Sequence, residues 1–166
     1  KLGTVVAVCL ITCFMGMAKS KILRAVAAVY VWCVRGTPMI VQAFLIYYAM
    51  PQVVQLMIPG FRIDPFPAGI ITLSLNAGAY MSEIFRGGIN AVSVGQIEAA
   101  RSLGLSKTKT MMKIVLPQAF KFSIPALVNQ FIITVKDSSI LSVIGLADVV
   151  NQAKVYVGKT YAFFPT

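Results

Sequence analysis

The sequence contains no histidine and few acidic residues, and each shortage excludes a class of protein. Five acidic residues stand beside 15 lysines and arginines, and only 12% of the 166 residues are charged. Without histidine, this sequence offers neither a Ser-His-Asp triad nor imidazole ligands for a metal ion. Soluble domains carry about 25% charged residues, whereas 58% of this sequence is hydrophobic. The composition therefore indicates an integral membrane protein.

Cysteine is also scarce. The three cysteines, Cys9, Cys13 and Cys33, all lie in apolar surroundings. Their odd number and their apolar setting argue against a disulfide framework. We interpret them as small packing residues, and we expect no metal site and no bound cofactor in this chain.

The net charge of +10 does not indicate a nucleic-acid partner, because the basic residues lie between apolar runs and form no continuous stripe. Most of them gather in two segments, 19–35 and 86–113. Cytoplasmic loops carry the excess of lysine and arginine in membrane proteins. We therefore expect both segments on the cytoplasmic side, Arg35 at the end of the first one included.

Four apolar segments are candidate membrane-spanning helices: 2–18, 38–50, 67–84 and 114–135. A spanning helix needs about 20 residues, so the first looks incomplete, and we expect the chain to be truncated at both ends. Segment 25–34 is too short to span and is expected at the membrane interface or packed on the bundle. Segment 51–65 is expected to be an outer loop. Segment 138–166 is expected on the outer side as well, with a short helix at 146–155.

Polar residues in the third candidate span fall on one helical face. Asn76, Tyr80 and Glu83 follow one another at helical spacing. Polar groups are costly in lipid, so this face is expected to turn toward protein or water. Asn76 could bond a neighbouring helix or line a substrate pathway, and the sequence favours neither. Glu83 is expected to pair with Arg86, since both lie near the cytoplasmic end.

The fourth candidate span carries a second polar face, made by Gln130, Thr134 and Asp137. An amide in the middle of the membrane, with a carboxylate two turns further out, suits a polar binding face. The alternative is a salt bridge between Asp137 and Lys136 or another neighbour. The candidate substrate-pathway residues are therefore Asn76, Tyr80, Asn129, Gln130 and Asp137.

Segment 86–113 is polar and rich in helix formers. Ser93 and Gln96 fit the capping box that opens a helix, and Gly104 is placed to end it with a left-handed turn. Ser106 can then cap a second helix. A small apolar face with a charged edge lies between them: Ala99, Ala100 and Leu103, with Glu98 and Arg101. Such a face suits a groove on another protein, although an amphipathic connector between membrane helices would show the same spacing.

Gly158-Lys159-Thr160 is similar to the end of a phosphate-binding loop, but the match is incomplete. The full pattern needs a glycine at position 153, where this sequence has Ala153. The loop must also follow a strand, and none is expected here. We do not expect this chain to bind ATP.

Several stretches resemble the membrane subunits of ABC importers, and in particular the permeases for polar amino acids. Glu98-Ala99-Ala100 and Gly104, followed by Ile114-Val115-Leu116-Pro117, resemble the EAA loop of that family. The other matching stretches occur in the family's order and cover nearly the whole chain: Arg35-Gly36-Thr37-Pro38, 79–89, 95–104, Leu116-Pro117-Gln118-Ala119 and Lys136-Asp137-Ser138-Ser139.

The resemblance implies an all-α integral membrane protein with the type I ABC permease fold. That fold is a helical bundle with five spanning helices per subunit, of which about four would be present here. Residues 1–166 would form one transmembrane permease domain, with a cytoplasmic coupling loop at 86–113. This loop would dock on an ATPase subunit through Glu98, Ala99, Ala100, Arg101, Ser102, Leu103 and Gly104. The further partners would be a second permease subunit, an extracytoplasmic amino-acid-binding protein and membrane lipid.

The resemblance also implies a function. The chain would be a non-enzymatic subunit that moves polar amino acids across the bacterial plasma (inner) membrane by alternating access, while a separate subunit hydrolyses ATP. Many family members have Glu where this chain has Gln130, which weakens the case for a purely basic substrate. Either the partner permease carries the site or the substrate is neutral. A permease for another small solute and an ATP-independent secondary transporter or channel are the alternatives.

Overall fold

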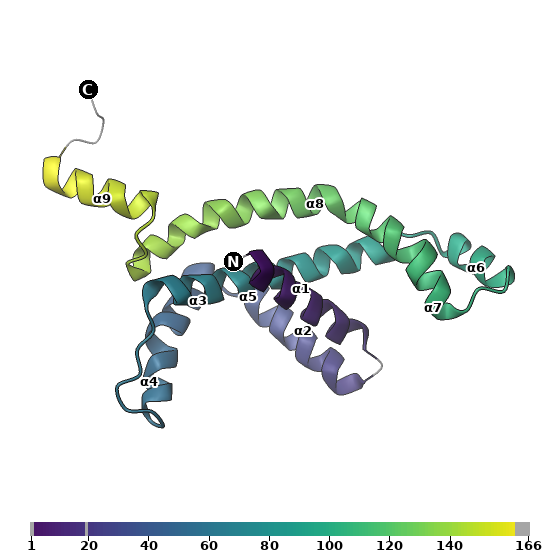
Figure 1. Cartoon of the computed structure of the whole chain (residues 1–166), viewed down its shortest axis with the longest axis horizontal. Helices are drawn as coiled ribbons and strands as arrows, with labels where there is room; N and C mark the ends of the chain where they lie inside the picture. The colour runs from purple at the N-terminus through teal and green to yellow at the C-terminus, as the bar shows by residue number, and fades with distance from the viewer. Residues whose placement is uncertain (1, 19, 162–166) are drawn as a thin grey trace.

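The computed structural model describes residues 2–18 and 20–161, and every regular element within these ranges is a helix. Figure 1 shows an elongated arrangement in which α8 runs along α5, while the pair α1 and α2 lies on the other side of α5. The α6–α7 segment lies at one end of the molecule and α9 at the other. The predicted all-helical fold is confirmed.

Helices α1 (Leu2–Met17) and α2 (Lys21–Gly36) form a hairpin that packs against α5 (Pro65–Asn90). The first candidate span is therefore a helix, as predicted. The second helix is longer than expected, because it begins at Lys21 and not at residue 25. It belongs to the bundle: the Tyr30 hydroxyl donates a hydrogen bond of 2.6 Å to the carbonyl oxygen of Leu75 on α5.

The chain bends by 110° between α2 and the helical run Met39–Gln55. Thr37 is extended, with φ −119° and ψ 142°, because the residue before a proline avoids the helical region. The run consists of α3 (Met39–Phe44), a π-helical stretch (Leu45–Ala49) and α4 (Met50–Gln55). The expected loop at 51–65 was thus wrong at its start, since Pro51 lies inside α4.

Arg35 lies next to this bend. It lies near the carboxyl end of α2, and Lys21 lies at the other end of the same helix. A rise of 1.5 Å per residue separates the two by about 20 Å. Arg35 and Lys21 thus lie at opposite ends of one regular helix, and the expected cytoplasmic side for Arg35 stays a prediction.

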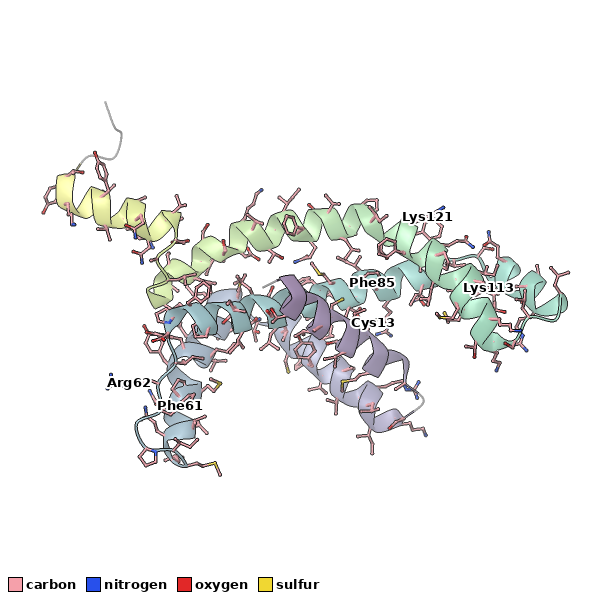
Figure 2. The ribbon with its side chains drawn as sticks, viewed as in Figure 1. Cys13, Phe61, Arg62, Phe85, Lys113 and Lys121 are labelled. Carbon is pink, nitrogen blue, oxygen red and sulfur yellow. The ribbon has the colours of Figure 1, made fainter. Side chains whose placement is uncertain are left out.

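Helix α5 packs closely on α1 and on α8 through small residues. A Cβ atom at Gly78 would lie 3.3 Å from the backbone nitrogen of Cys9 on α1, and one at Gly88 would lie 2.6 Å from the carbonyl oxygen of Ala119 on α8. Small residues of this kind let helices in membranes approach closely. Further along, the ring of Phe85 points toward α8 and stacks on Phe120 at 6.2 Å between centroids (Figure 2).

A helical run of 38 residues extends from Lys107 to Ile144. It comprises α7 (Lys107–Thr110), a π-helical stretch (Met111–Val115), α8 (Leu116–Asp137) and a 3₁₀ helix (Ser138–Ile144). Among the described residues this is the one continuous helix long and apolar enough to cross a membrane by length and composition, and the bent pair around Thr37 would make a second crossing.

A hydrophobic cluster ties the end of this run to the bend. Leu141 and Ile144 pack with Met39 and Ala43 of α3 and with Ala68 of α5. The chain then turns at Gly145, where φ is +81°. This cluster holds the bend, α5 and the end of α8 in one place.

The last described helix is α9 (Val149–Thr160). It begins three residues later and ends five residues later than the predicted 146–155 helix. Asp148 sets its start, because its Oδ1 accepts a hydrogen bond of 2.8 Å from the backbone N–H of Asn151. Gly158-Lys159-Thr160 forms the last turn of this helix and no phosphate-binding loop. Residues 162–166 of the expected outer segment lie outside the described residues.

Candidate substrate cavity and coupling segment

A cavity of about 510 Å³ lies at the bend between α2 and α3, with walls from α5 and α8. Its volume is in the usual range of ligand pockets, about 300–1,000 Å³. Four predicted pathway residues line it together with the bend: Asn76, Tyr80, Gln130 and Asp137. Asn129 does not line it, because this side chain is exposed on another face of α8.

Gln42 of α3 organises the bend. Its Nε2 donates to the carbonyl oxygen of Val34 at 2.7 Å, and to the carbonyl and hydroxyl oxygens of Thr37 at 3.1 and 3.0 Å. Its Oε1 accepts a bond of 3.1 Å from Nδ2 of Asn76 on α5. Asn76 thus makes the helix–helix bond that the sequence left open and also lines the cavity. The sequence analysis did not single out Gln42, although it is the one amide side chain in the apolar segment 38–50.

Replacing Gln42 with leucine is expected to lower the free energy of unfolding by about 2 kcal/mol, because interhelical hydrogen bonds in membranes contribute roughly 0.6 kcal/mol each and about three are lost, two from the N–H groups of the amide and one to its oxygen. The side chain is buried, and leucine would leave the Val34 and Asn76 groups without this partner. Thermal unfolding of the purified protein in detergent measures the change. Gln152→Leu, at an exposed position on α9, should leave the unfolding temperature unaltered; equal shifts in both variants would contradict the role of Gln42.

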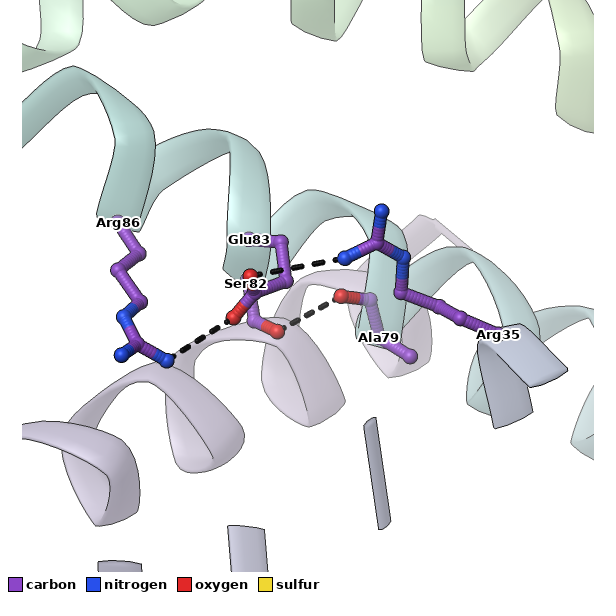
Figure 3. Close-up of polar contacts among 5 residues, drawn as sticks. All are labelled: Arg35, Ala79, Ser82, Glu83 and Arg86. Atoms are coloured by element: carbon purple, nitrogen blue, oxygen red, sulfur yellow. Dashed lines mark hydrogen bonds and ion pairs between the residues drawn. The ribbon is translucent and has the colours of Figure 1, made fainter. Parts of the chain in front are cut away.

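Three charged side chains meet beside this cavity (Figure 3). Glu83 of α5 lies between Arg35 of α2, with N–O 3.5 Å, and Arg86 of α5, with N–O 3.4 Å. The predicted Glu83–Arg86 pair is confirmed, whereas the contact with Arg35 was not predicted, because it depends on how α2 crosses α5. The guanidinium carbon of Arg35 also lies 5.3 Å from the ring centroid of Tyr80, a cation–π contact.

A second, larger cavity of about 920 Å³ lies between α1, α2 and α5. Its lining includes Lys21 and Arg24, which belong to the predicted cytoplasmic cluster, and Glu83 and Arg86. The two cavities share three lining residues: Arg35, Gly36 and Tyr80.

Asp137 faces the smaller cavity from the end of α8. The sequence allowed a salt bridge with Lys136, but within the described part of the chain Asp137 has no ion-pair partner. Thr134, on the same face, donates its hydroxyl to the carbonyl oxygen of Gln130 at 2.8 Å. The carboxylate is therefore available to a group that enters the cavity.

The predicted coupling segment begins with α6 (Val94–Ser102). Ser93 is its N-cap residue, but its side chain makes no capping hydrogen bond, so the predicted capping box is wrong. The reason is tertiary: the Gln96 side chain is engaged elsewhere, and its Oε1 accepts a bond of 2.5 Å from Nε2 of Gln118 on α8. This bond connects α6 to the long helix.

Gly104 ends the segment in the predicted left-handed conformation, with φ +81°. The N–H of Leu105 donates to the carbonyl oxygen of Ala100 at 3.2 Å, and the N–H of Gly104 donates to that of Arg101 at 3.0 Å. These two bonds define a Schellman motif. Ser106 caps α7, accepting from the N–H of Lys109 at 3.4 Å, as predicted.

One residue of the apolar face predicted on this segment is buried, and the other two are exposed. Ala100 is buried against the chain itself, whereas Leu103 is 83% exposed. The remaining residues predicted to couple are all exposed: Glu98, Ala99, Arg101, Ser102 and Gly104. The segment thus uses Ala100 as an anchor and presents Leu103 and its neighbours outward.

The comparison with known families decides the family of the chain. Residues 9–165 match a family model described as "binding-protein-dependent transport system inner membrane component". The chain belongs to this family. These proteins are membrane components of transport systems, in agreement with the fold and the hydrophobic composition described above.

The names of individual relatives each refer to the transport of an amino acid. The chain is 44% identical over 145 residues to the L-cystine transport system permease protein TcyB of Bacillus subtilis, with 87% of this chain and 59% of the relative covered. It is 42% identical over 162 residues to the arginine transport system permease protein ArtQ of the same organism, with 98% and 69% covered. With the glutamine transport system permease protein GlnP of Escherichia coli it shares 41% over 129 residues, with 78% and 57% covered.

A solved structure is also similar. It is described as the crystal structure of an amino acid ABC transporter with histidines, and it superposes with a TM-score of 0.89 at 42% identity. The match covers 98% of this chain and 73% of that one. The present chain thus spans only part of the length of the proteins it resembles.

Proposed function

We propose that this chain is the membrane-spanning subunit of an ATP-driven importer that carries polar amino acids across the bacterial plasma membrane. The observation that carries the proposal is the cavity at the bend, because its lining offers two amides, Asn76 and Gln130, one carboxylate, Asp137, and one guanidinium, Arg35. A small polar molecule with both charges would be recognised by such a set. The amino acid substrates in the names of the relatives support the same class.

In this proposal the chain is no enzyme, and separate ATPase subunits hydrolyse ATP. The ATPases would hold the exposed part of α6 and its turn at Gly104, and their closure would draw together this segment and that of a second permease subunit. Alternating access then requires a bundle with two arrangements that ligands at distant sites favour differently. The Gln96–Gln118 bond and the Ala100 anchor support the transfer of such a movement to α8. An extracytoplasmic binding protein would deliver the amino acid from the outer side.

Purification from native membranes in mild detergent, followed by mass spectrometry of the proteins that accompany the chain, tests this function. The expected result is an ATPase subunit in stoichiometric amount, together with a second permease subunit. A binding protein in the same preparation would reveal the substrate through its own ligand. A chain that emerges alone, or only with copies of itself, under conditions that keep complexes intact would favour an ATP-independent transporter instead.

Replacing Gln130 with glutamate is expected to shift the substrate preference toward basic amino acids by about tenfold, since hydrogen bonds to charged groups contribute about 1.5–3 kcal/mol and 1.4 kcal/mol is a factor of ten. The new carboxylate would stand beside Asp137 in the same cavity. Competition between labelled glutamine and arginine for uptake into proteoliposomes measures the shift. Gln152→Glu adds the same charge on exposed α9 and should change nothing; an unchanged profile in Gln130→Glu would remove this cavity from the pathway.

A further inference from the structure

Arg35 is the one residue with a charged side chain that lines both cavities in the described structure. Its neighbour Tyr80 lines both as well, and the guanidinium carbon lies 5.3 Å from the centre of that ring. Glu83 and Arg86 line only the larger cavity. The Arg35 guanidinium therefore lies between the two cavities, with the Glu83 carboxylate on one side and the candidate substrate cavity on the other.

The lining of the smaller cavity matches a zwitterion. Among the described residues that line it, Arg35 is the one cation and Asp137 the one anion, and the amides of Asn76 and Gln130 add polar groups. An amino acid carries a carboxylate and an ammonium group on the same carbon atom. A guanidinium offers a planar fork of donors that fits a carboxylate, and a lone carboxylate fits an ammonium group.

The ion pair between Arg35 and Glu83 is weak enough for a substrate carboxylate to displace Glu83. The Arg35 side chain is 45% exposed and that of Glu83 33% exposed, with 3.5 Å between the charged atoms. Ion pairs that water can reach contribute little, so a second carboxylate at short range competes with the first. Glu83 would not be left alone, because Arg86 already lies 3.4 Å from its other oxygen (Figure 3).

We propose that Arg35 binds the carboxylate of the amino acid substrate, and that it exchanges Glu83 for this carboxylate when the substrate occupies the cavity. Tyr80 keeps the guanidinium at the boundary in both states, and Arg86 retains Glu83 after the exchange. The departure of Arg35 from Glu83 removes one ion pair between α2 and α5 at the point where the two cavities meet. This proposal deepens the proposed function and rests on it.

The test uses the whole transporter, with its ATPase subunits, in nanodiscs without the binding protein. The probes are labelled L-glutamine, L-arginine and L-cystine, and, for the one that the transporter binds, the corresponding α-carboxamide. The carboxamide keeps the ammonium group and lacks the carboxylate. The measured quantity is the ratio of the two affinities, so a variant that merely contains less folded protein does not alter it.

The wild-type protein is expected to prefer the acid about tenfold, the factor that a charge-assisted hydrogen bond supplies. Arg35→Gln should remove the preference, and Arg35→Lys should keep part of it, because lysine retains the charge and loses the fork. Arg62→Gln serves as the matched control, since Arg62 is an exposed arginine in the loop after α4, away from both cavities (Figure 2). It should behave as wild type.

Two further variants test the exchange in opposite directions. Glu83→Gln removes the competitor and should raise the affinity for the acid about two- to threefold, the scale of an exposed ion pair. Arg86→Gln leaves Arg35 as the one counter-ion of Glu83 among the described residues and should lower that affinity by a similar factor. Neither should change the affinity for the carboxamide. Equal effects on acid and carboxamide would overturn the exchange, even if Arg35→Gln failed to fold.

The outcomes separate this inference from the function on which it rests. A transporter that binds one of the probes while Arg35→Gln retains the acid preference overturns the role of Arg35 alone. A wild-type transporter that binds none of the amino acids overturns the substrate class and the inference together.

Discussion

Replacing Gly104 with valine is expected to reduce ATP-dependent uptake at least about tenfold, while the protein still inserts into the membrane. The residue has φ +81°, a region that a β-branched side chain enters only with about 1–3 kcal/mol of strain. Relief of that strain would break the two hydrogen bonds of the Schellman motif at Ala100 and Arg101. The orientation of α6 relative to α7 would then change, and with it the proposed contact with the ATPase.

The matched control is Gly60→Val, because Gly60 has the same φ of +81° and equally open space around its Cβ position. It lies in the loop between α4 and α5, far from α6 (Figure 1). Uptake and ATP hydrolysis by the reconstituted transporter are measured together, with the amount of protein in the membrane as reference. Gly60→Val should keep hydrolysis and uptake coupled. Unchanged uptake by Gly104→Val would refute the coupling role of the segment.

Replacing Gly88 with alanine is expected to lower the free energy of unfolding by about 2–3 kcal/mol, the upper part of the usual range for an overpacked site. The new methyl group would lie 2.6 Å from the carbonyl oxygen of Ala119 and would also collide with the Ser123 hydroxyl. A carbonyl of the backbone cannot turn away as a flexible side chain can. Helices α5 and α8 would therefore have to separate at this crossing.

The adjacent glycine provides the control. A Cβ at Gly87 would meet nothing within 4 Å, so Gly87→Ala should stabilise α5 slightly, by up to about 1 kcal/mol, through the higher helix propensity of alanine. Unfolding of the purified protein in detergent, by heat or by denaturant, measures both variants. If Gly88→Ala were as stable as Gly87→Ala, the two helices would not approach each other as closely as the structure shows.

Turns, caps and ion pairs formed by residues close together in the sequence were predicted correctly where no other helix interferes. The left-handed turn at Gly104 and the cap at Ser106 arise from the conformational freedom of glycine and from a side chain that reaches its own backbone. The Glu83–Arg86 pair follows from helical spacing. The capping box at Ser93 failed for the complementary reason, because a residue on another helix, Gln118, engages Gln96.

The composition and the polar spacing also indicated which helices could line a site, although not where the site lies. Asn76 and Tyr80 on one helix, and Gln130 and Asp137 on another, were recognised because a polar face in an apolar helix needs protein or water beside it. Asn129 was included as a second polar residue about midway along the fourth span, but consecutive residues point to different sides of a helix. It is exposed in the structure.

The sequence by itself determined the membrane class of this protein, its helices and its local turns, because hydrophobicity, proline, glycine and side-chain caps act over a few residues. Only the tertiary structure decided the 110° angle of the bend that Pro38 starts, the place of Arg35 beside Glu83, and the bond of Gln42 to Asn76. Each depends on how α2, α3 and α5 cross. The angles at which helices cross are set by packing between segments far apart in the chain, so a local sequence pattern does not determine them.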